Sequence, residues 1–289
     1  MIQMSLHPQI TRQFIHIIGK IVEEFRLHIT KDGWKVISID PATVAEVEIN
    51  LPKENFLSYM FKESDLWTSN IDDHPTGVQI DEIAVGIEID KVKDFLDAGS
   101  ERVLDMELNE PIEFAFIQAA EKYQDTQSIP RYELIMKQGM FSKKILLMHE
   151  SEVRKYPKIY KLKLDYKIQL GTLELLRVIN KPGNVDYIRL GYDRDTGGMK
   201  FLATVEDGND LFTVEKLIEI GDFHGLRELN TNGRASSLYS MDYLQSIVSV
   251  IPSDYVWLHI RQDYPLIIEF TLGTTGQCKY IQAPRVETG

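Results

Sequence analysis

The chain has 289 residues, of which 43% are hydrophobic and 26% are charged, and its formal net charge is −12. This composition is typical of a folded globular chain, and it excludes a collagen-like repeat, a disordered polyelectrolyte and a disulfide scaffold. The length suits two domains better than one. Because the charge balance is acidic, a nucleic-acid partner would need a local basic surface.

No apolar run approaches the roughly 20 residues of a membrane helix, and the N-terminus lacks the layout of a signal peptide. The single cysteine, Cys278, allows neither an internal disulfide nor a cysteine-cluster metal site, and it suits a buried position in a strand. We therefore expect a soluble protein of a reducing, intracellular compartment, without a membrane partner.

The first half of the chain predicts a helix, a hairpin, further strands, a short helix and more strands. Apolar residues at Ile10, Phe14, Ile17 and Ile21 have helical spacing, and Asp90 is placed as the N-cap of the short helix. The predicted elements are a helix over 7–25, strands over 25–30, 34–39, 45–51 and 84–89, a short helix from 90, and strands over 102–108 and 131–148.

The second half repeats this plan after a basic stretch. Residues 149–163 carry five Lys or Arg and one proline, and we interpret them as an inter-domain linker. Asp242 repeats the capping role of Asp90. The later predicted elements are a helix over 171–185, a hairpin of 186–192 and 199–205, a strand and a helix within 236–251, and strands over 255–260, 266–272 and 278–283.

This internal repeat predicts an N-terminal domain over 1–148 and a C-terminal domain over 164–289. Each half has two helices and many strands. We expect an α+β fold in each domain, with two helices packed on antiparallel sheet.

The residues that an enzyme would need are missing from the sequence. There is no phosphate-binding loop, dinucleotide fingerprint or nucleophile elbow, and the seven histidines are scattered. The stretch 193–198 resembles the start of a calcium loop, but Thr204 stands where a glutamate is required. A hydrolase using Asp72, Asp73 and His74 is kept only as a contrast to a plain exposed loop. We predict no catalytic residue, no metal and no cofactor.

Four segments carry a resemblance to a known family. They are SIDPATVAEVEINLP (38–52), SSLYSMDYLQSIV (236–248), DYPLIIEF (263–270) and YIQAPRVE (280–287). In this order they resemble motifs of the archaeal and eukaryotic sliding clamps, the proliferating cell nuclear antigen (PCNA) family. The acidic balance and the APRVE ending favour the archaeal type.

The resemblance implies a processivity factor that encircles duplex DNA as a closed ring of three subunits, without catalytic chemistry. It also implies that DNA polymerase, ligase, nuclease and clamp loader dock short PCNA-interacting peptides into a pocket beneath the linker. The expected location is the cytoplasm, at the archaeal nucleoid, or the nucleus if the source is eukaryotic.

By position, the resemblance assigns the partner-peptide pocket to mostly apolar residues from three parts of the chain. An alternative is that these residues only close the junction between linker and sheet. They are Ile39, Asp40, Val44, Val153, Tyr156, Ile159, Pro265, Tyr280, Ile281, Ala283 and Pro284.

The family plan also places four helices around the central hole, where basic residues would face DNA. The candidates are Arg12, Lys20, Lys91, Lys93, Arg177 and Lys181. The four segments 8–25, 90–102, 171–183 and 240–254 nevertheless sum to a formal charge of −2. Because phosphate contacts carry sequence-independent affinity, this favours an alternative: a divergent paralogue that binds clamp partners or other subunits, as a monomer or in a heterotrimer, without encircling DNA.

Two stretches look inserted relative to the family plan, 62–77 and 110–130. The second has helical potential over 116–123, and it precedes a strand at 141–148 that in the family pairs with a neighbour's strand, here at 209–216. An extra element beside that edge could reinforce or obstruct the ring contact. The basic linker is a further departure, since this linker is acidic in many clamps; it would either alter partner choice or form a solvated charge run.

Overall fold

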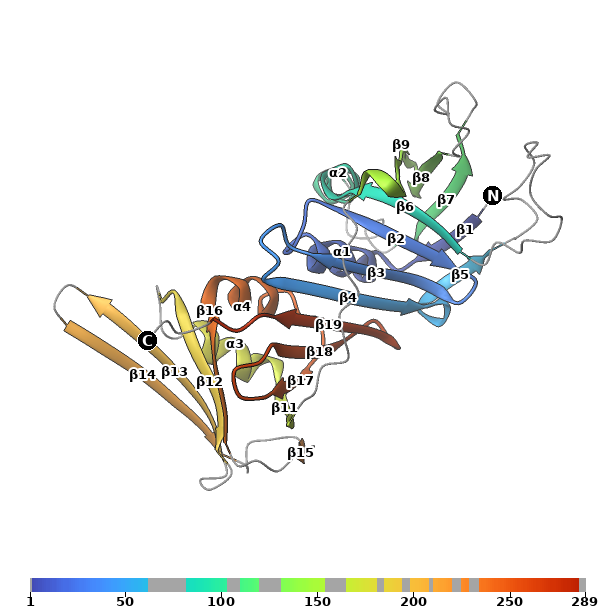
Figure 1. The fold of residues 1–289 in the computed structure, drawn as a ribbon. Coiled ribbons are helices and arrows are strands. Elements are labelled where there is room, and N and C mark those ends of the chain that lie inside the picture. Colours follow the sequence, from blue (N-terminus) through green and yellow to red (C-terminus); the bar gives the residue numbers. More distant parts are fainter. Residues whose placement is uncertain are drawn as a thin grey trace, which may run out of the picture. The chain divides into compact units, whose positions relative to one another are not determined.

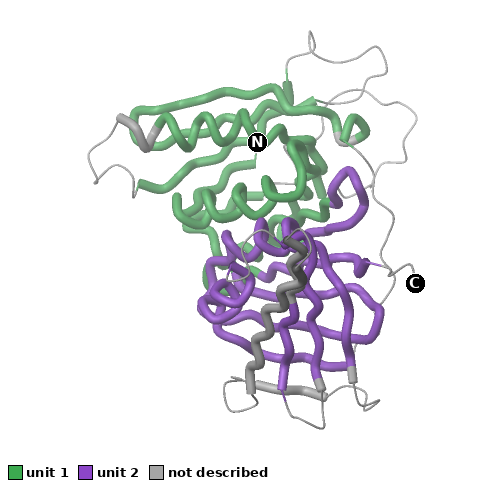
Figure 2. Tube along the Cα trace, turned by 90° about the vertical axis from the view of Figure 1, so that its left-hand side faces the viewer, with its two compact units in different colours: residues 1–38, 48–156, 272–276 green, residues 39–47, 157–271, 277–289 purple. Residues whose placement is uncertain are grey.

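The computed structural model describes residues 2–61, 82–102, 110–119, 131–153, 165–180, 185–193, 198–207, 210–219, 225–228 and 234–285. The chain divides into two compact units (Figure 2). Unit 1 comprises 1–38, 48–156 and 272–276, and unit 2 comprises 39–47, 157–271 and 277–289.

The first half of the chain supplies the helices and most strands of unit 1 (Figure 1). One sheet has the order β5-β1-β7-β8-β9, and a second run of paired strands has the order β10-β6-β2-β3-β4. The elements are β1 (Ile2–Leu6), α1 (Pro8–Ile18), β2 (Glu24–Thr30), β3 (Gly33–Ile39), β4 (Ala45–Pro52), η1 (Lys53–Asn55), β5 (Phe56–Met60), β6 (Glu82–Glu88), α2 (Ile89–Arg102), β7 (Ile112–Gln118), β8 (Tyr132–Gln138), β9 (Phe141–Leu146), β10 (Met148–His149) and η5 (Glu150–Glu152).

The second half builds unit 2 from the same kinds of element. One sheet has the order β14-β13-β12-β16, the other run has the order β19-β18-β17-β11-β15, and α3 and α4 pack against each other. The elements are β11 (Tyr166–Gly171), α3 (Thr172–Asn180), β12 (Tyr187–Asp193), β13 (Gly198–Asp207), β14 (Asp210–Glu219), β15 (Gly225–Glu228), β16 (Arg234–Ser240), α4 (Met241–Val248), β17 (Tyr255–Ile260), β18 (Leu266–Leu272) and β19 (Gly276–Gln282).

The strand orders show that the two halves repeat one topology. The order β5-β1-β7-β8-β9 matches β15-β11-β17-β18-β19, and the order β6-β2-β3-β4 matches β16-β12-β13-β14. In both halves a strand leads directly into a helix, as β1 does into α1 and β11 into α3. The predicted α+β fold with two helices per repeat is therefore confirmed.

The core of unit 1 is centred on the buried indole of Trp34. Its ring centre lies 5.6 Å from that of Phe14 on α1, 5.0 Å from Phe56 on β5 and 5.3 Å from Phe114 on β7. The indole N–H donates to Met4 Sδ at 2.9 Å. Since aromatic pairs of this geometry add to the free energy of burial, this one side chain joins a helix to both runs of strands.

The predicted helix over 7–25 is correct at its start, where His7 is the N-cap, and too long at its end. Helix α1 ends at Ile18, where Gly19 is its C-cap, and Phe25 lies in β2. The alternating burial of β2 explains this, because apolar residues at every second position suit a strand rather than a helix. The short strand β1, whose residues also alternate in burial, was not predicted.

The prediction of an inserted element with helical character after residue 110 is also wrong where the structure describes it. Residues 112–118 form β7, which pairs with both β1 and β8 in the middle of a sheet. Ile112, Phe114 and Phe116 are buried on one face of that strand. This segment is therefore part of the repeat plan, and residues 120–130 lie outside the described part of the chain.

Both predicted aspartate caps are misplaced by one or two positions. Helix α4 begins at Met241 after the N-cap Ser240, and α2 begins at Ile89, so Asp242 and Asp90 lie in the first turns. An acid there still complements the helix dipole. The predicted strand over 102–108 is wrong at Arg102, which ends α2. The rest of that strand, the loop 62–77 with its Asp72, Asp73 and His74, and most of the linker lie outside the described residues.

Candidate peptide-docking and DNA-facing sites

The loop between β3 and β4, residues 40–44, is shaped by the buried carboxylate of Asp40. Its Oδ1 accepts hydrogen bonds from the backbone N–H groups of Val44 and Ala45, both at 2.7 Å. Its Oδ2 accepts the N–H of Ala42 at 2.9 Å. Asp40 is 3% exposed, so its charge organises the chain itself and does not face solvent.

Tyr243, in the first turn of α4, completes the set of donors to Asp40. Its hydroxyl donates to Asp40 Oδ2 at 2.8 Å. Burial, followed by the hydrogen bond to Asp40 and its charge, raises the pKa of Tyr243 above the usual 10.0. Sequence reasoning missed Tyr243, although it lies inside the motif 236–248; the available signal was a polar side chain in the first turn of an otherwise core-facing helix.

The end of β19 lies beside this loop within unit 2. The N–H of Ala283 donates to the Val44 carbonyl at 2.8 Å. Two residues later the N–H of Arg285 donates to the Leu238 carbonyl of β16 at 2.7 Å, and the Arg285 guanidinium lies 3.8 Å from the ring centre of Tyr187. The segment after β19 is thereby fixed against both the loop and an edge strand.

The loop that precedes β18 is fixed on the same strand, β16. The Tyr239 hydroxyl donates to the Tyr264 carbonyl at 2.8 Å, and the Tyr264 N–H donates to Ser237 Oγ at 3.2 Å. Pro265 follows directly. The structure thus brings three of the predicted pocket segments, around residues 40–44, 264–265 and 280–284, into one unit.

The predicted pocket residues of unit 2 differ in how accessible they are. Four are buried, namely Ile39, Asp40, Tyr280 and Ile281. Four are half-buried and present surface to solvent, namely Val44, Pro265, Ala283 and Pro284.

Of the three pocket residues predicted in the linker region, the structure describes Val153 alone. Val153 lies in unit 1, buried over Gly86, where a Cβ would stand 2.5 Å from Val153 Cγ2. The Val153 carbonyl accepts a hydrogen bond from Arg26 at 3.0 Å. Tyr156 and Ile159 lie outside the described residues.

In unit 1 the predicted DNA-facing cations are partly engaged with the protein. Lys91 forms an ion pair with Glu88. Lys93 reaches the end of α1, because a Cβ at Gly19 would lie 3.2 Å from its Nζ, and there it complements the helix dipole. Lys20, beyond the end of α1, is exposed.

Arg12 is half-buried on α1, and its Nη2 has no hydrogen-bond partner among the residues that the structure describes. In unit 2, Arg177 is exposed on α3, with its Nη1 3.9 Å from Glu174 Oε2. Lys181 lies outside the described ranges. Helix α4 has no Lys or Arg, and its acid is the exposed Asp242.

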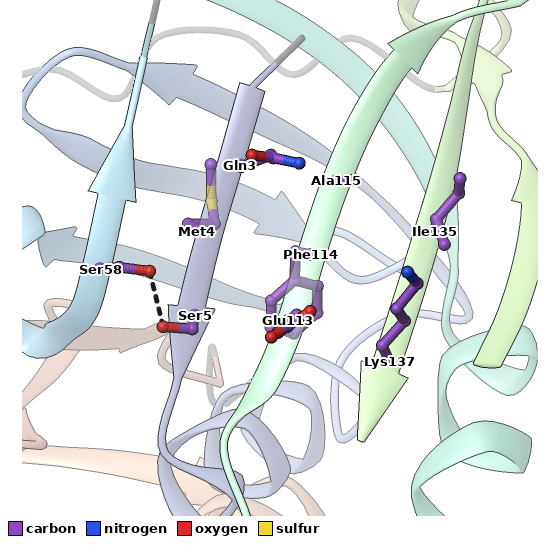
Figure 3. Close-up of a pocket in the computed structure, with 9 residues that line it drawn as sticks. All are labelled: Gln3, Met4, Ser5, Ser58, Glu113, Phe114, Ala115, Ile135 and Lys137. Carbon is purple, nitrogen blue, oxygen red and sulfur yellow. Dashed lines mark hydrogen bonds between the residues drawn. The ribbon is translucent and has the colours of Figure 1, made fainter. Parts of the chain in front are cut away.

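A polar pocket of about 220 Å³ opens on the sheet face of β5, β1, β7 and β8 (Figure 3). Ser5 and Ser58 lie opposite each other and share a hydrogen bond of 2.7 Å, and Glu113 lies opposite Lys137. The lining contains no histidine or cysteine.

Within the described ranges, no group of three or more His, Cys, Asp or Glu side chains could hold a metal ion. In the same ranges, no helix has the length and apolar character needed to cross a membrane. Cys278 lies in β19 with 2% exposure, and burial raises the pKa of its thiol to about 12. A thiol of this kind is a poor nucleophile.

Comparison with known proteins gives full-length matches. The chain is 26% identical over 291 residues to the DNA polymerase sliding clamp of Archaeoglobus fulgidus and 26% identical over 293 residues to that of Methanocella arvoryzae, and each match covers 100% of both chains. No protein-family model matches the chain.

Solved structures share the fold. A structure described as the C-terminal region of FEN-1 bound to A. fulgidus PCNA matches with a TM-score of 0.75 and 23% identity, covering 100% of both chains. PCNA from Thermococcus kodakaraensis matches with a TM-score of 0.73 and 18% identity over 99% of this chain and 100% of that one. The chain is thus similar along its whole length to archaeal DNA polymerase sliding clamps, and it shares the two-repeat fold of the solved PCNA structures.

Proposed function

We propose that this chain is a DNA polymerase sliding clamp, which encircles duplex DNA as a ring and tethers replication and repair enzymes. The observation that carries this proposal is the similarity to archaeal clamps over the entire chain, on the same fold. The clamp acts by topology and has no catalytic activity of its own. It works at the chromosome, in the cytoplasm of an archaeon.

The partner contact is a short peptide bound at unit 2, next to the loop 40–44 and the end of β19. The likeness to a clamp solved with the C-terminal region of FEN-1 supports this mode of binding. The half-buried apolar surface of Val44, Pro265, Ala283 and Pro284 suits an apolar anchor of such a peptide. Polymerase, ligase, nuclease and clamp loader would dock there in turn.

Self-association is supported by two sheet edges. Among the described strands, β9 is the last of its sheet in unit 1, and β14 is the last of its sheet in unit 2. An edge strand presents unpaired N–H and C=O groups that a second chain can pair with. A solved PCNA2–PCNA3 complex from Sulfolobus tokodaii, which matches with a TM-score of 0.68, is a precedent for contact between such chains. We expect a trimeric ring.

The test is retention on DNA of defined topology. After loading by the replication factor C of the source organism, or of A. fulgidus, the clamp should stay on nicked circular DNA and slide off the same DNA once it is linearised. Equal retention on both forms would contradict encirclement. Peptide binding without retention on either form would favour the paralogue that binds clamp partners without encircling DNA, which the summed helix charge of −2 motivates.

A further inference from the structure

The loop 40–44 is a tight turn closed by two backbone hydrogen bonds, from the Thr43 N–H to the Asp40 carbonyl at 3.0 Å and from the Asp40 N–H to the Ala45 carbonyl at 2.9 Å. Thr43 has φ = +59°, the left-handed region that a β-branched residue seldom occupies. No glycine relieves this turn, since the loop reads Asp-Pro-Ala-Thr-Val. Hydrogen bonds must therefore offset this strain, and most of the bonds that the loop makes involve the backbone or the carboxylate of Asp40.

The two carboxylate oxygens of Asp40 accept hydrogen bonds from different groups. Oδ1 is occupied by two backbone N–H groups, those of Val44 and Ala45, whereas Oδ2 accepts the Ala42 N–H and the Tyr243 hydroxyl. Tyr243 is thus the side-chain donor that fixes the orientation of the carboxylate, and through it the two sides of the loop.

Further hydrogen bonds fix the start of α4, the helix that carries Tyr243, to the end of β19. Gln282 Nε2 donates to the carbonyl of Ser240, the N-cap of α4, at 2.9 Å, and Gln282 Oε1 accepts the Tyr280 hydroxyl at 3.1 Å. One residue later, the Ala283 N–H returns to the Val44 carbonyl of the loop. The start of α4, the end of β19 and the loop are therefore fixed relative to one another within unit 2.

We propose that Tyr243 is a positioning residue for peptide docking: without touching the peptide, it holds Asp40 and thereby the loop 40–44 in the conformation that receives a partner. This inference rests on the proposed peptide docking at unit 2. It adds a residue of α4, on a helix that the clamp plan directs toward DNA, to the determinants of partner affinity.

Removing the Tyr243 hydroxyl should change the conformation of the loop 40–44 without unfolding the protein. Tyr243 is half-buried, and α4 is held to the core by Met241, Leu244, Ile247 and Val248, which Tyr243→Phe leaves intact. A hydrogen bond to a charged group contributes enough that its loss weakens a dependent equilibrium by about tenfold.

The experiment is calorimetric titration of the full chain with a synthetic peptide of the FEN-1 C-terminal sequence. Wild type, Tyr243→Phe, Asp40→Ala and the double variant are compared. Tyr59→Phe is the matched control, since it removes one tyrosine hydrogen bond, to the Thr30 carbonyl at 2.6 Å, in the other compact unit. We expect Tyr243→Phe to raise Kd about tenfold and Tyr59→Phe to change it less than twofold.

The Kd of the double variant distinguishes a positioning role from a merely structural one. If Tyr243 acts through Asp40, adding Tyr243→Phe to Asp40→Ala should change Kd less than twofold, whereas independent effects would multiply. If wild type and Tyr243→Phe bind the peptide equally well, the role of Tyr243 is overturned and the docking proposal stands. Wild type that fails to bind would overturn the docking proposal together with it.

Discussion

Charged side chains connect neighbouring strands in unit 2, and Glu269 is the clearest case. Glu269 on β18 lies with Oε2 2.9 Å from His259 Nε2 on β17 and 2.5 Å from Lys167 Nζ on β11. His259 is only 5% exposed. The close contact with His259, supported by Lys167 and opposed by burial, lowers the pKa of Glu269 from 4.5 to about 2. The charged form is thus favoured in the folded state.

This depressed pKa predicts how stability depends on pH. Glu269→Gln should lower the free energy of unfolding by about 1 kcal/mol at pH 7, a value reduced for the partial exposure of the carboxylate. Because a depressed pKa stabilises the fold above the unfolded value, the difference from wild type should shrink as pH falls from about 4.5 toward 2. Urea unfolding at pH 7, 4 and 3 measures it.

A surface pair provides the control for Glu269. Asp94 is 72% exposed at its side chain and lies 3.3 Å from Lys143. Asp94→Asn should leave the free energy of unfolding nearly unchanged at each pH, because exposed pairs contribute little. A Glu269→Gln difference that stayed constant from pH 7 to 3 would contradict the assignment of the effect to this carboxylate.

At the scale of elements, the register of the β8–β9 hairpin determines which backbone groups of β9 face the open edge of its sheet. Its two-residue loop places Gly139 at φ = +55°, as a tight hairpin turn requires, so Gln138 and Phe141 form the closing pair. Hydrogen-bonded pairs then alternate along the strands, and Lys144, opposite Ile135, directs its N–H and C=O toward the open edge. This edge is the one that the proposed ring needs.

Lys144→Pro should therefore break assembly and spare the subunit. The substitution removes one outward N–H and places the proline ring at the open edge, where proline is tolerated by the sheet itself. Light scattering behind a sizing column should give about three times 33.3 kDa for wild type and a single subunit for the variant. Lys144→Ala, which removes only the ion pair with Glu133, should keep the ring. A trimeric Lys144→Pro protein would exclude β9 from the subunit contact.

At the scale of the whole molecule, the proposed function requires an acidic chain to surround DNA, which is a polyanion. The net charge is −12, and the cations on the helices are few and partly bound to the protein, as Lys91 is to Glu88. Affinity for phosphates grows with the number of contacts, so each contact here would be weak. A closed ring tolerates this, because it leaves DNA only by opening.

Charge reversal on α2 tests whether these weak contacts matter. Lys91→Glu with Lys93→Glu should reduce stimulation of a polymerase on primed circular DNA several-fold, more strongly at low salt, because two of the few local cations become anions. Lys31→Glu with Lys53→Glu changes the net charge equally at two other exposed positions and should have less effect. If both double variants lose stimulation equally, the effect comes from net charge. If Lys91→Glu with Lys93→Glu leaves stimulation unchanged, Lys91 and Lys93 do not contact DNA.

The sequence alone determined the resemblance to the sliding clamps, the two-repeat α+β plan and most strands. These follow from local patterns, such as the alternation that makes 45–52 a strand, and from contiguous motifs such as the segment 280–287. Patterns fail where elements are short or ambiguous: β1 has only five residues, and the aromatic run of β7 fits a helix or a strand until its partners β1 and β8 are known.

The tertiary structure alone decided what each site residue does. Position in the family plan brought Asp40 into the pocket, but only the fold shows that its carboxylate is buried and bound to three backbone N–H groups. Tyr243 joins it from 203 residues away in sequence. The sequence records which side chains exist and how they repeat along the chain, whereas a hydrogen bond between distant segments exists only once packing has fixed the distance between its two atoms.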